Sequence, residues 1–93
     1  MFYVSKRIEI AYAHQLDLDY ESKCTHLHGH NAVVIVYCKA KELDHNGMVV
    51  DFKKVKDIVQ GQLDHRFAND VVNFNTTAEN LAKWICDQVP HCY

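Results

Sequence analysis

The sequence of 93 residues has few chain-breaking residues and no excess of positive charge. Three Gly and one Pro leave no flexible linker and no collagen-like repeat. Ten Lys and Arg against twelve Asp and Glu give a net charge of -2, which predicts no basic surface for nucleic acid. The absence of a continuous apolar run near the start predicts neither a signal peptide nor a membrane span. We therefore expect a cytoplasmic protein without nucleic-acid or membrane partners.

The residues that are present suit a small globular protein. Hydrophobic residues make up 48% of the chain, too many for a disordered segment. We expect residues 1–93 to form one domain that is marginally stable by itself, so that a metal, disulfides or partner subunits contribute. Seven His and four Cys make a metal the first expectation. In a reducing compartment, and without a CxxC pair, the cysteines are predicted to be thiols: Cys24, Cys38, Cys86 and Cys92.

Two strands are predicted in the first half of the chain. Apolar residues alternate from Phe2 to His14, as is typical of a half-buried strand. A polar stretch without periodicity follows over residues 15–25 and predicts a loop with a functional role. Residues 28–41 contain a β-branched and aromatic run at residues 33–37, which is apolar at both odd and even positions. This run predicts a second strand that is covered on both faces.

Two helices are predicted in the second half, after a turn at residues 44–47. Asp51 can cap the first, whose apolar residues recur at helical spacing as far as Leu63. Residues 76–79 have the capping-box pattern, with Thr76 as the expected cap of a second helix that Pro90 ends. The order strand, strand, helix, helix predicts an α+β fold. Because two strands make a poor sheet, further strands are either missing from this chain or supplied by neighbouring subunits.

Histidines at the predicted strand ends indicate a metal site. His28 and His30 are two residues apart on a strand, so their side chains point the same way. An antiparallel first strand would bring its end, His14, beside them. Three imidazoles around Zn²⁺ leave the fourth position open, which is the catalytic pattern. A bare HxH pair would more simply be two histidines without a metal, but the facing His14 favours zinc.

Further side chains carry chemistry that the residue types alone leave open. Cys24 follows a lysine in the loop and could act as a base or nucleophile, as a fourth zinc ligand, or as an ordinary small side chain. Cys38 and Cys86 fit packing roles in the second strand and the second helix. The neighbouring Asp64 and His65 could transfer protons, although residue types alone favour a structural role. The remaining histidines are expected in solvent: His26, His45 and His91.

Five motifs in compatible order give the chain a family resemblance. It resembles the 6-pyruvoyl-tetrahydropterin synthase / 6-carboxy-tetrahydropterin synthase (QueD) family over nearly its whole length, up to Pro90, and separated motifs together are far more specific than any one alone. The motifs are Ala13-His14, Cys24-Thr25-His26-Leu27-His28-Gly29-His30-Asn31, Gly47-Met48-Val49-Val50-Asp51-Phe52, Leu63-Asp64-His65 with Asn69, and Thr76-Thr77-Ala78-Glu79-Asn80-Leu81-Ala82.

The resemblance implies a tunnelling (T) fold, in which four antiparallel strands carry two helices between the second and third strands. In that family three subunits join their sheets into a barrel, two trimers stack into a hexamer, and active sites lie between subunits. The resemblance also implies roles for individual residues. Zn²⁺ is bound by His14, His28 and His30; Cys24 is the catalytic base; Asp64 and His65 form a proton relay; Thr76 and Thr77 contact the pterin.

The implied reaction starts from a pterin, 7,8-dihydroneopterin triphosphate. The queuosine branch yields 6-carboxy-5,6,7,8-tetrahydropterin, acetaldehyde and triphosphate, whereas the biopterin branch yields 6-pyruvoyl-tetrahydropterin. The short spacing from Cys24 to His28 resembles the queuosine branch. Glu21 is at the position of a Glu in a subgroup that resembles enzymes making 6-hydroxymethyl-dihydropterin for folate synthesis, which implies a possible dual role. An ordinary solvent-exposed loop acid is an equally good interpretation of Glu21.

One departure from the family bears on activity. The family continues with two more strands, the first of which carries a Glu that holds the pterin. This sequence stops at Tyr93, where that strand is expected to begin, so we expect a C-terminally truncated domain or a replaced hairpin. A non-catalytic zinc- or pterin-binding subunit is therefore the alternative to a lyase.

Overall fold

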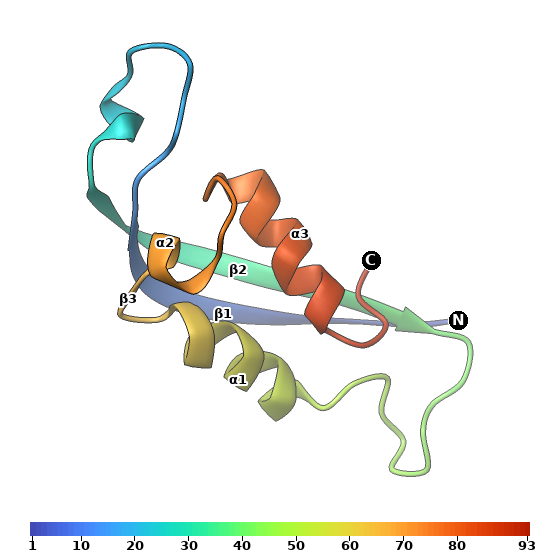
Figure 1. The fold of residues 1–93 in the computed structure, drawn as a ribbon. Coiled ribbons are helices and arrows are strands. Elements are labelled where there is room, and N and C mark those ends of the chain that lie inside the picture. Colours follow the sequence, from blue (N-terminus) through green and yellow to red (C-terminus); the bar gives the residue numbers. More distant parts are fainter.

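The computed structural model describes residues 1–93 and is built on one long antiparallel strand pair. Strand β1 (Phe2–His14) pairs with β2 (His28–Ala40) along their whole length, from Phe2 opposite Ala40 to His14 opposite His28 (Figure 1). Both predicted strands are confirmed. The loop between them extends past the strand ends and contains the short 3-10 helix η1 (Lys23–Thr25).

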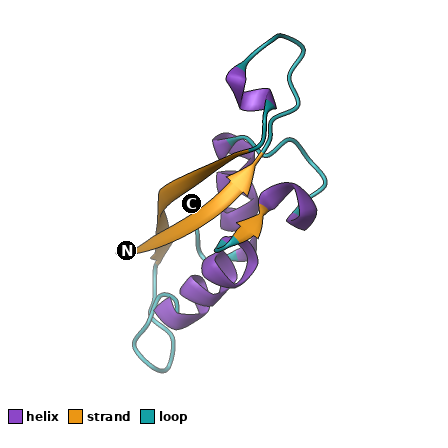
Figure 2. Cartoon of the chain, turned by 90° about the vertical axis from the view of Figure 1, so that its left-hand side faces the viewer, coloured by secondary structure: helices purple, strands orange, loops and turns teal.

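The helices cover only one face of the strand pair. Helices α1 (Phe52–Leu63) and α3 (Ala78–Gln88) lie on the same side of it (Figure 2). The prediction that the second strand is covered on both faces is wrong in this chain, because no element covers the opposite face and Val33, Ile35 and Tyr37 are 46–50% exposed. The core between strands and helices consists of Ile8, Ile10, Val36, Cys38, Val49, Val55, Val59, Leu63, Ala68, Leu81, Ile85 and Val89.

Both long helices begin at side-chain caps. Asp51 caps α1 by accepting a hydrogen bond from the backbone N–H of Lys53, as predicted. The cap of α3 is Thr77, which accepts from the N–H of Asn80. The expectation of Thr76 as the cap was wrong by one residue, because Thr76 is fully buried and its hydroxyl faces inward.

Two short elements between the long helices have no counterpart in the sequence analysis. Strand β3 (Arg66–Phe67) pairs in parallel with the end of β1, and helix α2 (Ala68–Val71) follows it. The chain reaches this edge through His65, which has a left-handed backbone (φ 57°) and donates its N–H to Ala11 O at 2.6 Å. The sheet therefore has three strands in the order β2-β1-β3.

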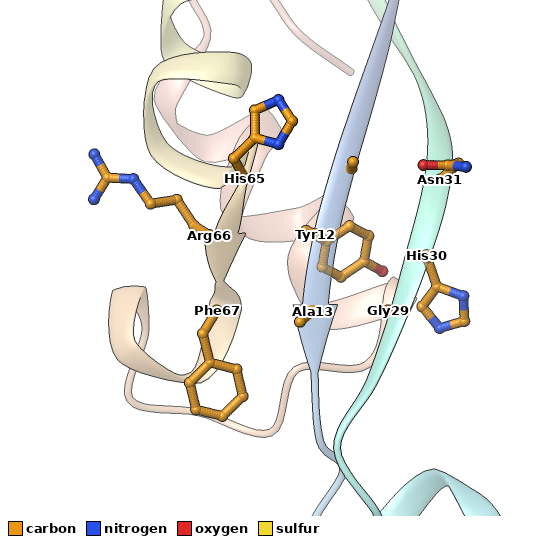
Figure 3. Close-up of a pocket in the computed structure, with 9 residues that line it drawn as sticks. Tyr12, Ala13, Gly29, His30, Asn31, His65, Arg66 and Phe67 are labelled. Carbon is orange, nitrogen blue, oxygen red and sulfur yellow. The ribbon is translucent and has the colours of Figure 1, made fainter.

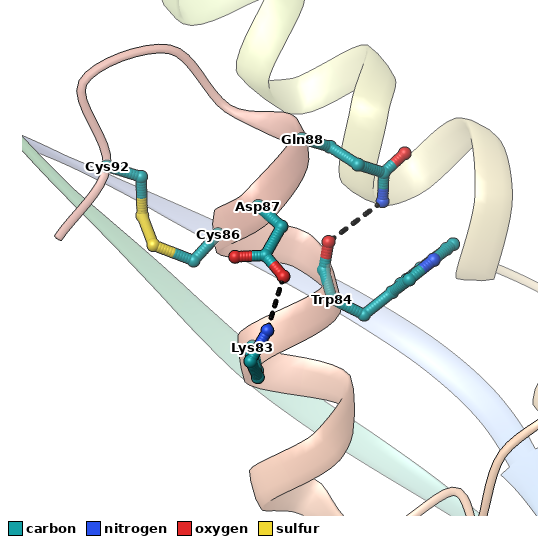
Figure 4. The surroundings of a disulfide bond; sticks show 6 residues. All are labelled: Lys83, Trp84, Cys86, Asp87, Gln88 and Cys92. Atoms are coloured by element: carbon teal, nitrogen blue, oxygen red, sulfur yellow. Dashed lines mark hydrogen bonds and ion pairs between the residues drawn. A yellow bond between two sulfur atoms is a disulfide. The ribbon is translucent and has the colours of Figure 1, made fainter.

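The last residues fold back onto the other edge of the sheet. Cys92 forms an antiparallel bridge with Cys38. Cys92 also forms a disulfide with Cys86, with 5.4 Å between their Cα atoms (Figure 4). The expectation of four thiols, and of Cys86 as a packing residue, was therefore wrong: the chain reverses through His91 (φ 66°) and brings the two cysteines together. Cys24 and Cys38 are free, and Cys38 is a packing residue as predicted.

None of the helices combines the length and the apolar character that crossing a bilayer requires.

Loss of the disulfide will lower the stability of the chain. The bond joins residues six apart, so Cys92→Ser is expected to reduce the free energy of unfolding by about 2 kcal/mol through greater freedom of the unfolded chain. Urea denaturation without reductant measures the change. Cys24→Ser, at an exposed free thiol, is the matched control and should have little effect. Four reactive thiols in the unreduced, denatured parent chain would contradict the disulfide.

Asp44, in the turn before α1, is expected to make the thermal stability of the fold decrease at acid pH. Asp44 Oδ1 accepts hydrogen bonds from the N–H groups of Met48 (3.0 Å) and Asn46 (2.9 Å), and the Met48 bond is the largest cause that lowers the pKa of Asp44 below its ordinary value of 3.8. A lowered carboxyl pKa stabilises the fold above the unfolded-state value, and this contribution is lost as pH falls through the folded-state value. Asp44→Ala should therefore lower the melting temperature more at pH 7 than at pH 2. Asp19→Ala, at another exposed acid, serves as the control; equal effects of Asp44→Ala at both pH values would refute the linkage.

Candidate metal centre and active site

Three histidines converge where the two long strands end. His14 lies directly opposite His28, and His30 lies two residues further along β2 on the same face. The ring centroids are 4.5–4.9 Å apart, and one ring nitrogen from each residue lies within 4.8 Å of the others. The predicted convergence of the rings is confirmed. Together the three histidines can form a metal site.

Backbone carbonyls orient two of these rings. His14 Nδ1 lies 2.7 Å from Thr76 O, and His28 Nδ1 lies 2.7 Å from His26 O. A carbonyl oxygen only accepts, so both Nδ1 atoms carry the proton and both Nε2 atoms have a free lone pair. His14 Nε2 is 3.0 Å from His30 Nε2. Nitrogens bound tetrahedrally to one zinc lie about 3.3 Å apart, so the observed spacing fits such an ion.

The protonation state and exposure of the cluster also suit a metal. His14 is 5% exposed, and burial is the main cause that lowers its pKa, with His28 and His30 lowering it further. A neutral imidazole is the form that binds metal. His30 is exposed, so a small molecule can approach the cluster from that side. No Cys, Asp or Glu joins the three imidazoles, and such a donor set resembles catalytic rather than closed structural zinc sites.

Cys24 lies in the loop that connects the two histidine-bearing strand ends. Its backbone N–H is capped by Ser22 Oγ at 3.2 Å, and its carbonyl accepts from Leu16 N at 2.8 Å. The second bond joins the two arms of the loop just beyond His14. The Cys24 thiol is exposed and is not part of the imidazole cluster, so its role as a base stays a prediction.

Asp64 and His65 lie outside this cluster. Asp64 Oδ1 accepts from Ala11 N at 2.8 Å, and Oδ2 is 3.7 Å from Nε2 of the 84% exposed His65. His65 lines an open hollow of about 490 Å³ (Figure 3). Ala11 and Ala13, which also line it, face away from the helices and from His14. His30 lines the same hollow, but neither Asp64 nor His65 belongs to the imidazole cluster of this chain.

The residues expected to bind the pterin lie in different surroundings. Thr76 is fully buried, with its carbonyl on His14 and its hydroxyl 3.2 Å from Asn69 Oδ1. Thr77 caps α3, and Glu21 is exposed in the loop. Their pterin contacts stay predictions.

Sequence reasoning missed the groups that hold the rings in place. The carbonyls of Thr76 and His26 leave no trace in residue type, because every residue has one. Asn69 was noted only as part of a motif, and a polar side chain near a predicted helix gives no indication of what it will contact.

Comparison with known proteins identifies relatives along most of the chain. A family model described as 6-pyruvoyl tetrahydropterin synthase matches residues 3–93. A 6-carboxy-5,6,7,8-tetrahydropterin synthase from Bacillus subtilis is 33% identical over 95 residues, covering 95% of this chain and 65% of that protein. The protein of the same name from Rickettsia bellii is 36% identical over 72 residues, covering 77% of this chain and 51% of that protein. The chain thus spans between about half and two thirds of these curated relatives.

The fold agrees with this relationship. The structure of 6-pyruvoyl tetrahydropterin synthase from Caenorhabditis elegans matches with a TM-score of 0.69 and 28% identity, covering 92% of this chain and 74% of that one. The chain belongs to the 6-pyruvoyl tetrahydropterin synthase family. The resemblance and the α+β fold class expected from the sequence are confirmed.

The imidazole cluster predicts one bound metal ion per chain. Replacing His14, His28 or His30 by Asn should weaken binding by more than about 100-fold, because each change removes a ligand nitrogen. Elemental analysis and competition titration with a chelator measure content and affinity. His26→Asn is the matched control, since residue 26 contributes only its backbone carbonyl and should keep the metal. Full metal content in the His28→Asn variant would contradict the assignment of these three histidines as metal ligands.

Proposed function

We propose that this chain provides the catalytic centre of a zinc-dependent 6-carboxytetrahydropterin synthase, a lyase that acts on a pterin. The reaction is the conversion of 7,8-dihydroneopterin triphosphate and water to 6-carboxy-5,6,7,8-tetrahydropterin, acetaldehyde and triphosphate, in queuosine biosynthesis. The observation that carries the proposal is the cluster of His14, His28 and His30, which has three oriented nitrogens and no fourth protein donor. Relatives named 6-carboxy-5,6,7,8-tetrahydropterin synthase support this choice of product.

In this proposal, the first role of the chain's own residues is to hold the metal ion. His14, His28 and His30 would hold the ion with their Nε2 atoms, while the Thr76 and His26 carbonyls keep two of the Nδ1 protons in place. Bound Zn²⁺ supplies Lewis-acid polarisation of the substrate's side-chain oxygens, which acidifies the neighbouring carbon. The exposed side of His30 gives the pterin side chain its path to the centre.

Proton transfer falls to two groups that flank the substrate in our proposal. The Cys24 thiolate takes the proton from the acidified carbon, because its exposed loop lies next to the strand ends that carry the cluster. His65 then moves protons on the opposite side of the substrate. Asp64 accepts a hydrogen bond from Ala11 N, and its second oxygen lies 3.7 Å from His65 Nε2.

The arrangement of these groups supports a homo-oligomer. His65 is 84% exposed and lies outside the imidazole cluster of its own chain, so a second copy can bring its His65 to the cluster. The open sheet face also exposes apolar side chains of Val33, Ile35 and Tyr37, which an oligomer would bury. We propose a trimer, or a hexamer made of two stacked trimers, as in the family the chain resembles.

Removal of the Cys24 thiol tests the proposed chemistry. Cys24→Ala should lower turnover of 7,8-dihydroneopterin triphosphate by at least about 100-fold, since general-base catalysis contributes roughly that much or more. Metal content should stay unchanged, because the thiol is not part of the imidazole cluster. Acetaldehyde release and chromatography of the pterins measure the reaction.

Product analysis separates the alternatives. Formation of 6-pyruvoyl-tetrahydropterin would assign the biopterin branch, and 6-hydroxymethyl-dihydropterin would assign the folate-related activity. Glu21→Gln is the matched variant for the latter, because it removes the carboxylate and should affect only that product. If the metal-loaded oligomer releases no acetaldehyde and changes no pterin, the lyase proposal is wrong; loss of zinc from Cys24→Ala would make Cys24 a ligand.

A further inference from the structure

The segment that leads from His14 into the loop is held by two asparagine side chains. Gln15 N donates to Asn69 Oδ1 at 3.0 Å, and Asn69 Nδ2 donates to Gln15 O at 2.8 Å. The same pair of bonds recurs two residues later. Asp17 N donates to Asn75 Oδ1 at 2.9 Å, and Asn75 Nδ2 donates to Asp17 O at 2.8 Å.

The two side-chain amides make the backbone hydrogen bonds that a neighbouring strand would otherwise make. A primary amide has one acceptor oxygen and donor hydrogens, so it can satisfy the N–H and C=O of one backbone residue together. In an extended segment, residues two apart direct these groups to the same edge, and the residue between them directs its groups to the other. Leu16 accordingly donates to Cys24 O at 2.8 Å on the opposite edge. The segment is thus hydrogen-bonded to Asn69 and Asn75 on one side. On the other side it is hydrogen-bonded to Cys24 in η1 (Lys23–Thr25), which we call the Cys24 turn.

The first asparagine is also connected to the imidazole cluster. The Thr76 hydroxyl lies 3.2 Å from Asn69 Oδ1 and 3.3 Å from Gln15 O, and the Thr76 carbonyl holds His14 Nδ1. Thr76 is fully buried, and its hydrogen bond with His14 is buried, whereas its two hydroxyl contacts are partly buried. A displacement of Asn69 is therefore expected to change the orientation of the His14 ring through Thr76.

The second asparagine is anchored to the helix layer. Its backbone carbonyl accepts from Asn80 Nδ2 at 3.0 Å, within the first turn of α3. The Asn75 side chain is hydrogen-bonded to Asp17 in the loop and makes no hydrogen bond to the histidines or to Thr76. The two asparagines consequently act on different parts of the site.

We propose that Asn69 and Asn75 are positioning residues that fix the Cys24 turn relative to the imidazole cluster. Asn69 sets the orientation of His14 through Thr76, and Asn75 sets the path of the loop that carries Cys24. The loop of residues 15–27 joins the two strand ends, and without these bonds it would sample many paths at little free-energy cost. The assignment deepens the proposed function and rests on it for the role of Cys24.

Two alanine variants and one matched control test the proposal with Co²⁺ as the probe. Asn69→Ala should weaken Co²⁺ binding by about 10–100-fold and change the visible absorption spectrum of the bound ion, as expected when a group that orients a metal ligand is lost. Asn75→Ala should keep that spectrum and raise the rate of Cys24 alkylation by iodoacetamide several-fold. Asn73→Ala, at an exposed asparagine without side-chain hydrogen bonds, should change neither.

A conservative variant keeps the test decisive if alanine impairs folding. Asn69→Asp retains the acceptor for Gln15 N but places a carboxylate oxygen against Gln15 O, so its Co²⁺ spectrum should lie between those of the parent and of Asn69→Ala. Circular dichroism shows which variants are folded. The proposal is overturned if the folded Asn69 variants keep the parent spectrum and affinity, or if Asn75→Ala leaves the alkylation rate unchanged. Neither readout needs turnover, so a chain that binds Co²⁺ but converts no pterin would refute the proposed function separately.

Discussion

The register between β1 and β2 is the constraint on which the site depends. It places His14 opposite His28 and puts His30 on the same face. A slip by one residue would turn one set of side chains to the other face, separating His14 from the other two rings and moving Ile8 and Ile10 out of the core. The pairing that builds the core therefore also brings the three imidazoles of the candidate metal site together.

The helix layer converts three neighbouring imidazoles into an oriented set. The segment before α3 delivers the carbonyl of Thr76 to His14 and brings the side chains of Asn69 and Asn75 to the start of the loop. Burial keeps His14 neutral, with its pKa lowered, while His30 stays exposed. The site thus combines one ring fixed in the interior with one that a ligand can reach.

The open face of the sheet is the basis of the proposed oligomer. Val33, Ile35 and Tyr37 lie exposed on it, and His65 lines a hollow together with Val33. The helices cannot cover this face because they occupy the other one. A second copy would bury the apolar residues and supply His65 in one step, which is why we regard oligomerisation and activity as a single proposal.

The sequence by itself determined both long strands, both long helices and the convergence of His14, His28 and His30, because each depends on a local period or on the simple geometry of an antiparallel pair. Only the tertiary structure decided the rest. Strand β3 has two residues and therefore no period, and the disulfide depends on a chain reversal through His91. The contacts of Asn69 and Asn75 join residues more than fifty positions apart, and such contacts are set by packing rather than by neighbouring residues.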